Sequence, residues 1–514
     1  MNQRGDITEL YHTAANNPPC QHCDGAPCGP CVELADIETR IEDLHSRLRD
    51  LHEKHRAARS NRNNVHNRSM LQLPLEIVSH IFVLCLQPLN LCFSKSEGFP
   101  FTIIAVCRAW RVLALSTPSL WSSSAVNIST PDVGHINHRL MHSGSLPISL
   151  HLYSMISRRG TPNTTEVLNL IKKNLYRTRT LCLDLFDEHI NEFSSTSGCP
   201  SSMPLLQELH VHGRIVIEGS SELKLSTTPP RPQTVYVDSY FANDIVLDWS
   251  GVSNLTLQDT TIKVSLGLLS MAKRLVDLTL NILAMETWQL GLYSSNTPIV
   301  HHSIRHLALE GGVTAHVIFS FSTMTSLDTL SILNLTELSP KFAAFLRRSS
   351  CALRCLRLEF TEYFSADQLI DVLSETPALQ ELSLFDGYHR ETTIDSLLER
   401  LSLTPSRSSE NGIFLPCLRS FEYAGYVSSY APFLGIFSPS EGIPARALQK
   451  VDIKVPAHTL DRPPFLSRSD LQRILHLQKA GKHISITAND STGFDILKRS
   501  MDIYCLSESS DEGG

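Results

Sequence analysis

The chain has 514 residues, of which 42% are hydrophobic and 19% are charged, and its net charge is −7. This length predicts more than one structural unit, and the composition excludes a chain that is mostly disordered. The slight acidic excess gives no general support for a nucleic-acid-binding or membrane-surface protein. No apolar run reaches the ~18 residues of a membrane-spanning helix, and the start MNQRGDITEL lacks a signal-peptide pattern. With 13 cysteines along the chain, we expect reduced thiols and a location in the cytoplasm or nucleus.

Residues 1–33 are polar and are predicted to form a disordered leader unless a metal organises them. They contain two C-x-x-C pairs, whose thiolates are candidate zinc ligands: Cys20, Cys23, Cys28 and Cys31. Only four residues separate the two pairs. The usual zinc ribbons and fingers place ~12–20 residues there, so the metal-free interpretation is favoured and zinc is the alternative.

Residues 34–60 are predicted to form a helix with a heptad repeat. Its apolar residues alternate spacings of three and four: Leu34, Ile37, Ile41, Leu44, Leu48 and Leu51. This pattern is typical of a short coiled coil, so a homodimer through residues 34–55 is one interpretation. The other is an amphipathic helix that packs on the rest of the protein. The chain is basic from Arg47 to Arg68, and we interpret this stretch as a solvated helix end because residues 60–64 break the helical pattern.

Residues 70–122 combine three short predicted elements. In the first, Ile77, Ile81 and Leu84 follow helical spacing. Residues 103–113 do the same in a second predicted helix, and a third short element follows. A segment this short buries little apolar surface by itself. We therefore expect exposed apolar side chains that a partner covers.

The same segment resembles the F-box family, in the form common in large fungal families. The resemblance rests on LPLEIVSHIF, VCRAW and PSLW, which occur in this order, although the link over residues 87–102 is longer than usual. It implies binding to the Skp-type adaptor of an SCF-type cullin–RING ubiquitin ligase and, through the adaptor, to cullin. The residues that would make this contact, or shape the helices that make it, are Leu73, Pro74, Glu76, Ile77, Ile81, Phe82, Val106, Cys107, Trp110, Leu120 and Trp121.

Residues 123–506 repeat the pattern apolar-x-x-apolar-x-apolar. Nine full copies occur between residues 206 and 453, and three weaker copies centre on Leu181, Val235 and Ile484. The intervals average about 27.5 residues, a period typical of leucine-rich repeats. We therefore predict an α/β fold, an irregular leucine-rich-repeat solenoid with a parallel β-sheet and with helices such as residues 365–377 between strands. The alternative is another α/β protein in which the pattern arises by accident.

The alternation of side chains along each strand predicts which residues face outward. If Leu209 and Val211 point into the core, their polar neighbours line the open face of the sheet. The same rule selects the candidate target-binding residues His210, His212, Thr256, Gln258, Thr279, Arg357, Glu359, Phe385 and Lys454. Their mixed charge suits a protein ligand better than nucleic acid. Residues 507–514 are acidic and are predicted to form a flexible tail.

The sequence carries none of the patterns GxGxxG, GxxxxGK[ST] or GxSxG, and no catalytic set stands out. We therefore expect a non-catalytic protein without a cofactor. The F-box resemblance implies the substrate-recognition subunit of an SCF-type ligase, whose repeats bind an unknown protein target. One alternative is a self-associating scaffold without a role in degradation. A weaker alternative is a zinc-assisted nucleic-acid binder built on the cysteines and the basic stretch.

Overall fold

The computed structural model describes residues 28–66, 73–86, 99–155, 162–195, 198–213, 222–238, 245–282, 298–362, 365–386, 394–402, 414–427, 429–437, 448–456, 466–488 and 494–504. The chain divides into two compact units, residues 1–86 with 98–117 and residues 87–97 with 118–514. The boundary at residue 117 lies inside the predicted 70–122 segment. Most of the predicted leader, the acidic tail, and Cys20 and Cys23 lie outside the described residues. None of the described helices combines the length and the apolar character that a membrane-spanning segment requires.

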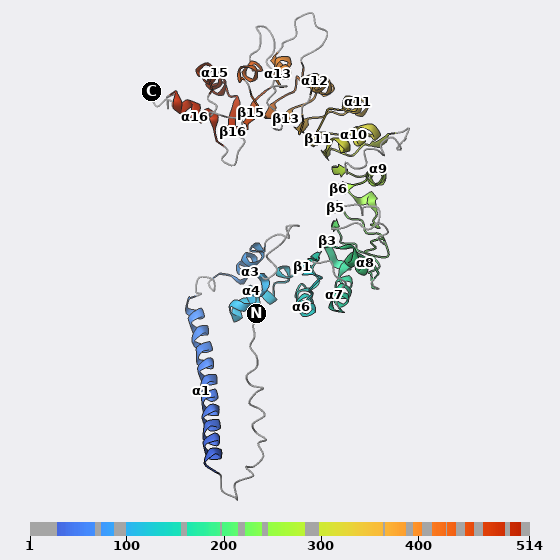
Figure 1. Cartoon of the computed structure of the whole chain (residues 1–514). Helices are drawn as coiled ribbons and strands as arrows, with labels where there is room; N and C mark the ends of the chain where they lie inside the picture. Colours follow the sequence, from blue (N-terminus) through green and yellow to red (C-terminus); the bar gives the residue numbers. More distant parts are fainter. Residues whose placement is uncertain are drawn as a thin grey trace, which may run out of the picture. The chain divides into compact units, whose positions relative to one another are not determined.

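The described part of the first unit is helical, with α1 (Gly29–His66), α3 (Leu75–Leu84), α4 (Phe99–Val106) and α5 (Arg108–Leu115) (Figure 1). Helix α1 is longer than the predicted 34–60 helix. It begins at Gly29, inside the predicted leader, because the carbonyl of Cys28 accepts hydrogen bonds from the backbone N–H groups of Cys31 and Val32. It also continues through residues 60–64, where the predicted break is wrong. Asparagine lowers helix propensity by less than about 1 kcal/mol per residue, which does not end a long helix.

The second predicted helix of this unit is in fact two helices. Cys107 separates α4 from α5 and has an extended backbone, with φ −156° and ψ 170°. Its Sγ accepts a hydrogen bond from the backbone N–H of Trp110 at 3.5 Å. Cys107 thus occupies the N-cap position of α5, which Ser, Thr, Asp or Asn more often fill. Helix α4 also includes residues 99–102, which were expected to belong to the irregular link.

The second unit is built around a parallel sheet of 14 strands, which is the α/β organisation that the repeats predict. Each strand pairs with the next one of the sheet along the chain, so spatial order follows sequence order. The strands are β1 (Ser123–Asn127), β2 (Ile148–Tyr153), β3 (Thr178–Leu185), β4 (Glu208–Gly213), β5 (Thr234–Asp238), β6 (Asn254–Thr260), β7 (Asp277–Ile282), β9 (His306–Glu310), β11 (Thr329–Leu335), β12 (Cys355–Phe360), β13 (Glu381–Asp386), β14 (Ser420–Ala424), β15 (Lys450–Val455) and β16 (His483–Ala488). The last four residues of each of the nine full copies lie on a strand of this sheet, and the three weaker copies centre on β3, β5 and β16. Strands β8 (Ile299–His301) and β10 (Ser322–Met324) form a separate parallel pair.

Helices connect many of the strands and lie on one face of the sheet (Figure 1). They are α6 (Val133–His142), α7 (Pro162–Lys172), α8 (Asp187–Ser195), α9 (Ile262–Met271), α10 (Gly312–Phe321), α11 (Pro340–Ser349), α12 (Ala366–Ser374), α13 (Ile394–Ser402), α14 (Ala431–Gly435), α15 (Arg468–Lys479) and α16 (Ile496–Ile503). Helix α12 confirms the helix predicted over residues 365–377. Because strands lie about 4.8 Å apart and packed helices 8–10 Å apart, the sheet curves with its strands on the inner side.

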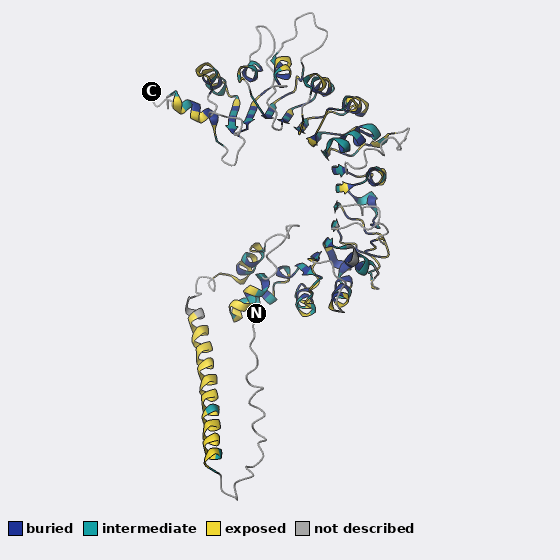
Figure 2. Ribbon diagram, viewed as in Figure 1, coloured by how far each residue is buried: buried dark blue, intermediate teal, exposed yellow. Residues whose placement is uncertain are grey.

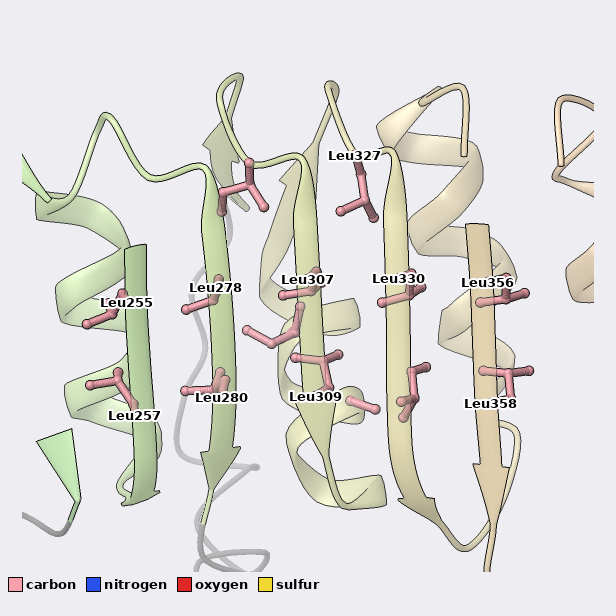
Figure 3. Packing of buried hydrophobic residues seen from close by; sticks show 14 of the residues in the cluster. Leu255, Leu257, Leu278, Leu280, Leu307, Leu309, Leu327, Leu330, Leu356 and Leu358 are labelled. Carbon is pink, nitrogen blue, oxygen red and sulfur yellow. The ribbon is translucent and has the colours of Figure 1, made fainter. Parts of the chain in front are cut away.

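The core lies between this sheet and its helices. Leucines at equivalent pattern positions are aligned by the strand register, as Leu255, Leu278 and Leu307 show in consecutive strands (Figure 3). Leu330 and Leu356 continue the row, and these five side chains are at most 2% exposed. Each such leucine contributes about 1.5–3 kcal/mol relative to an exposed side chain. The leucine of one strand is therefore covered by those of its two neighbours and by a helix.

Candidate functional site

Helices α3 and α5 pack through one side of α3. Val78 and Phe82 lie on this side and are 4% and 3% exposed. The ring of Phe82 lies 5.0 Å from that of Trp110 on α5, at an angle of 57°. Helices α4 and α5 are joined by a hydrogen bond that Nε of Arg111 donates to the carbonyl of Ile104 at 2.8 Å. These contacts fix the three helices as a small module.

The other side of α3 leaves apolar side chains in solvent. Ile77 and Leu84 are 48% and 70% exposed, and Ile81 between them is half-buried. Their i, i+4, i+7 spacing places these three residues along one helix face. Further exposed apolar side chains of the module are Leu73, Leu75, Val106 and Val112. We call the shared face of Ile77, Ile81 and Leu84 on α3 the apolar surface of the helical module.

The structure divides the predicted adaptor-binding residues into three groups. The exposed ones are Leu73, Pro74, Glu76, Ile77 and Val106, and the half-buried ones are Ile81, Cys107 and Trp110. Phe82 is buried against α5, so it shapes the module and is not available to a partner. The prediction did not select Leu84 and Val112, although the spacing of Ile77, Ile81 and Leu84 already indicated the face on which Leu84 lies.

Leu120 and Trp121 are a correction to the predicted adaptor-binding set. Leu120 ends the short 3₁₀ helix η3 (Pro118–Leu120), and the two side chains are 0% and 1% exposed inside the second unit. The ring of Trp121 lies 5.2 Å from that of His138 and 5.5 Å from that of His142, both on α6. These two side chains are therefore buried and offer no surface to a partner. The sequence of the motif does not show which element of the chain, or which partner, covers the large apolar residues at its end.

The nine predicted target-binding residues all lie on the open face of the sheet, opposite the helices. Their neighbours Leu209 and Val211 are 0% and 1% exposed, which confirms the predicted alternation. The candidates extend from β4 to β15, so they do not form one compact site. His210 is the most buried of them, with 9% of its surface exposed.

A cluster of aromatic rings occupies the open face of β4 and β5. The strand register places His210 next to Tyr236, and their rings are stacked 5.9 Å apart. The ring of His212 lies 4.7 Å from that of Tyr236, and its Nδ1 lies 3.6 Å from Oδ2 of Asp238. We call His210, His212 and Tyr236 the aromatic cluster; only His210 and His212 were predicted. The register between strands β4 and β5 brings Tyr236 in, and the sequence pattern alone does not fix that register.

The two histidines of β4 have ring nitrogens that no described residue satisfies. Nδ1 of His210 and Nε2 of His212 are buried and have no hydrogen-bond partner among the described residues. Burial lowers the pKa of His210, and the neighbouring His212 and His151 lower it further, whereas Glu208 acts in the opposite direction. His210 is therefore held neutral at pH 7, and its ring can donate or accept a hydrogen bond. Buried polar atoms of this kind normally have a hydrogen-bond partner, which water or a bound ligand can supply.

The open face near β14 and β15 differs, because its charges are paired with one another. Nζ of Lys454 lies 2.6 Å from Oε1 of Glu422, and Nζ of Lys450 lies 2.5 Å from Oδ2 of Asp452. Farther along the sheet, the guanidinium of Arg357 lies over the ring of Phe385 at 4.3 Å. We call Glu422, Lys450, Asp452 and Lys454 the charged ladder.

The carboxylates of the charged ladder are stabilised in their ionised form. Partial burial alone would raise the pKa of Glu422, but hydrogen bonds from Lys454 and Ser383 outweigh it and hold the pKa below its usual value. The pKa of Asp452 is lowered in the same way, by hydrogen bonds from Lys450 and Ser485 that outweigh its partial burial. These two carboxylates therefore carry fixed negative charges at neutral pH.

Across the described ranges, no group of three or more His, Cys, Asp or Glu side chains is arranged to hold a metal ion. Of the four predicted zinc ligands, Cys28 and Cys31 are described, and their Sγ atoms lie 3.3 Å apart at the start of α1. A scan against protein-family models found no match for the chain, and a search of curated proteins found no similar sequence.

Proposed function

We propose that the chain is the substrate-recognition subunit of an SCF-type cullin–RING ubiquitin ligase. The helical module, which we infer to be an F-box, would bind the Skp-type adaptor. The observation that carries the proposal is the apolar surface of this module, on which Leu84 is 70% and Ile77 48% exposed. A module this small lacks the neighbours that cover such side chains, and a partner protein supplies them.

We propose further that the second unit is an irregular leucine-rich-repeat solenoid that holds a protein target on its open face. The consecutive parallel strands and the aligned leucines support this proposal. In this proposal the aromatic cluster is the anchor for the target, because aromatic side chains often contribute most of the binding energy at protein interfaces. The charged ladder, whose charges already have partners, would contribute less to binding because a target has to displace those contacts.

In this proposal the chain performs no chemistry. It holds the target beside the ubiquitin-conjugating enzyme that the RING subunit recruits, and the rate enhancement comes from proximity. Such a receptor acts in the cytoplasm or nucleus, where the rest of the complex resides.

The proposal is tested by co-purification of the full-length chain with a Skp-type adaptor. The variant Ile77→Glu places a charge on the apolar surface and is expected to abolish adaptor binding. A matched control is Val300→Glu on β8, because Val300 has the same exposed fraction of 48% but lies in the second unit. If the wild-type chain binds no Skp-type adaptor, or if Ile77→Glu binds as well as Val300→Glu, the proposed function is wrong.

A second candidate function is a self-associating scaffold that binds partners without causing their degradation. Helix α1 favours it, because its heptad residues Leu44 and Leu51 are both 61% exposed. Partner levels distinguish the two functions: deletion of residues 73–117 raises the level of a degradation target in cells but leaves the partner of a scaffold unchanged.

A further inference from the structure

Helix α1 presents a continuous apolar seam that is exposed along its length. Of the six heptad residues, Leu34, Ile37, Leu44, Leu48 and Leu51 are 45–61% exposed, and Ile41 is half-buried. Figure 2 shows α1 as exposed over almost its whole described length. Six large apolar side chains on one side of a helix are stable in water when a second helix covers them.

Charges flank this seam unevenly from one end to the other. Glu33 and Glu38 lie beside its beginning, at the heptad positions next to Leu34 and Ile37. Lys54 and Arg59 occupy the equivalent flanking positions at its end. All four side chains are exposed, so the seam runs from an acidic end to a basic end.

We propose that α1 forms an antiparallel coiled coil with α1 of a second copy of the chain. In an in-register parallel pair, Glu33 would face Glu38 and Lys54 would face Arg59 of the other copy, so like charges would meet at both ends. In the antiparallel pair the acidic end of each helix lies beside the basic end of the other. Glu33 then faces Lys54 of the second copy, and this attraction occurs twice in the symmetric dimer.

The antiparallel alignment also covers the whole seam. Placing Leu34 opposite Leu51 sets Ile37 opposite Leu48 and Ile41 opposite Leu44, so all six apolar side chains have apolar partners. His55, the next residue in the heptad pattern, lies beyond this overlap, whereas a parallel pair would bring two His55 side chains together. The overlap spans 18 residues, or about 27 Å of helix, so a weak, reversible dimer is expected.

The middle of this alignment brings like charges together. Arg40 faces Arg47 of the second copy, but each arginine has an acidic partner on its own helix. Arg47 lies 2.8 Å from Asp43, and Arg40 lies 3.9 Å from Asp36. These pairs offset much of the repulsion at the centre of the dimer.

Sedimentation equilibrium of the full-length protein at about 1–100 μM tests the proposal, because a weak dimer dissociates in this range. We expect a monomer–dimer equilibrium that Leu44→Glu abolishes. The single changes Glu33→Lys and Lys54→Glu each turn two attractions into repulsions and are expected to raise the Kd about tenfold. The double variant E33K/K54E restores the attraction and returns the Kd to within about twofold of wild type.

The charge variants also report the orientation of the helices. In a parallel dimer, Glu33→Lys would face Glu38 and would tighten the dimer, which would overturn the proposal. Glu53→Lys, on the opposite side of α1 from the seam, is the matched control and is expected to leave the Kd unchanged. A chain that is monomeric at every concentration, or a dimer that Leu44→Glu does not affect, would also overturn it. None of these results depends on adaptor binding, so the proposed function is tested separately.

Discussion

Similar apolar side chains are exposed on the helical module and buried in the sheet of the second unit. Leu356 and Leu358 on β12 are 2% and 0% exposed, whereas Ile77 and Leu84 on α3 are 48% and 70% exposed. The difference is in the neighbours, because β12 lies between β11 and β13, which carry leucine or isoleucine in the same register. Helix α3 has one covered side and one side without such a neighbour. Repetition along the chain thus supplies within the second unit the cover that the helical module is proposed to obtain from another protein.

Phe82→Ala is expected to unfold the helical module, and of the changes considered it should have the largest effect on stability. Phe82 is 3% exposed and contacts the Trp110 ring, so its removal leaves a cavity between α3 and α5. Truncation of a buried phenylalanine costs about 3–5 kcal/mol, which is comparable to the whole stability of a small module. Hydrogen exchange followed by mass spectrometry should show lost protection over residues 75–115 and unchanged protection in the sheet. Equal loss of protection in both regions would contradict an effect confined to the helical module.

Leu384→Ala makes the equivalent change in the sheet. Leu384 is fully buried and is paired in register with Leu358 and Tyr423. The expected cost is about 2–5 kcal/mol, and it should be confined to the neighbouring strands because each strand contacts only the next ones. Hydrogen exchange should show lost protection in β12–β14 and not in β2–β5. The variant Glu381→Gln on the same strand is the control, because Glu381 is exposed.

Much of the second unit could be predicted because one pattern specifies both the position of each strand and the orientation of its side chains. The leucines mark each strand, and their alternation with polar residues identifies the face that is buried. Strand β1 was not predicted, because its sequence SSAVN lacks the leucine pattern. The rings of His210 and Tyr236 come together through the register of two strands, and a pattern within one strand does not contain that information.

The helical module could be predicted less completely. Its helical spacing continued across Cys107, so the break between α4 and α5 was missed; it depends on the backbone conformation of this residue and on the hydrogen bond to its Sγ. The sequence identified Phe82, Leu120 and Trp121 as large apolar residues of the motif. Whether each of them contacts a partner or the interior depends on the packing of distant elements, and all three prove to be buried.

The charged ladder allows a smaller test of the sheet. The pKa of Glu422 is held below its usual value in the folded chain, so the folded state binds fewer protons than the unfolded state in acid. Its contribution to stability is therefore present above the unfolded pKa of about 4.3 and is lost as the pH falls through the lower folded value. Lys454→Met removes the partner and is expected to cost about 1 kcal/mol or less at pH 7.

Urea unfolding of both proteins at pH 7 and pH 3 measures this effect. The difference in stability between wild type and Lys454→Met should be present at pH 7 and should become smaller toward pH 3, as the pH falls through the lowered pKa of Glu422. The exposed Lys263 on α9 provides the control Lys263→Met, for which no difference is expected at either pH. A difference that persists in acid would show that Lys454 stabilises the sheet through packing rather than through its charge.

The smallest expected effect on stability belongs to Ile77→Ser. Ile77 is 48% exposed, so this substitution removes little buried surface and should change the stability of the module by less than about 0.5 kcal/mol. Protection of α3 against hydrogen exchange should therefore stay close to wild type, in contrast to the loss expected for Phe82→Ala. If Ile77→Ser lowers this protection as much as Phe82→Ala does, then Ile77 is covered within the folded chain and the apolar surface is not free for a partner. If protection is kept while adaptor binding is lost, the Ile77 side chain serves recognition and not folding. A residue that acted only by stabilising the module would lose protection and adaptor binding together.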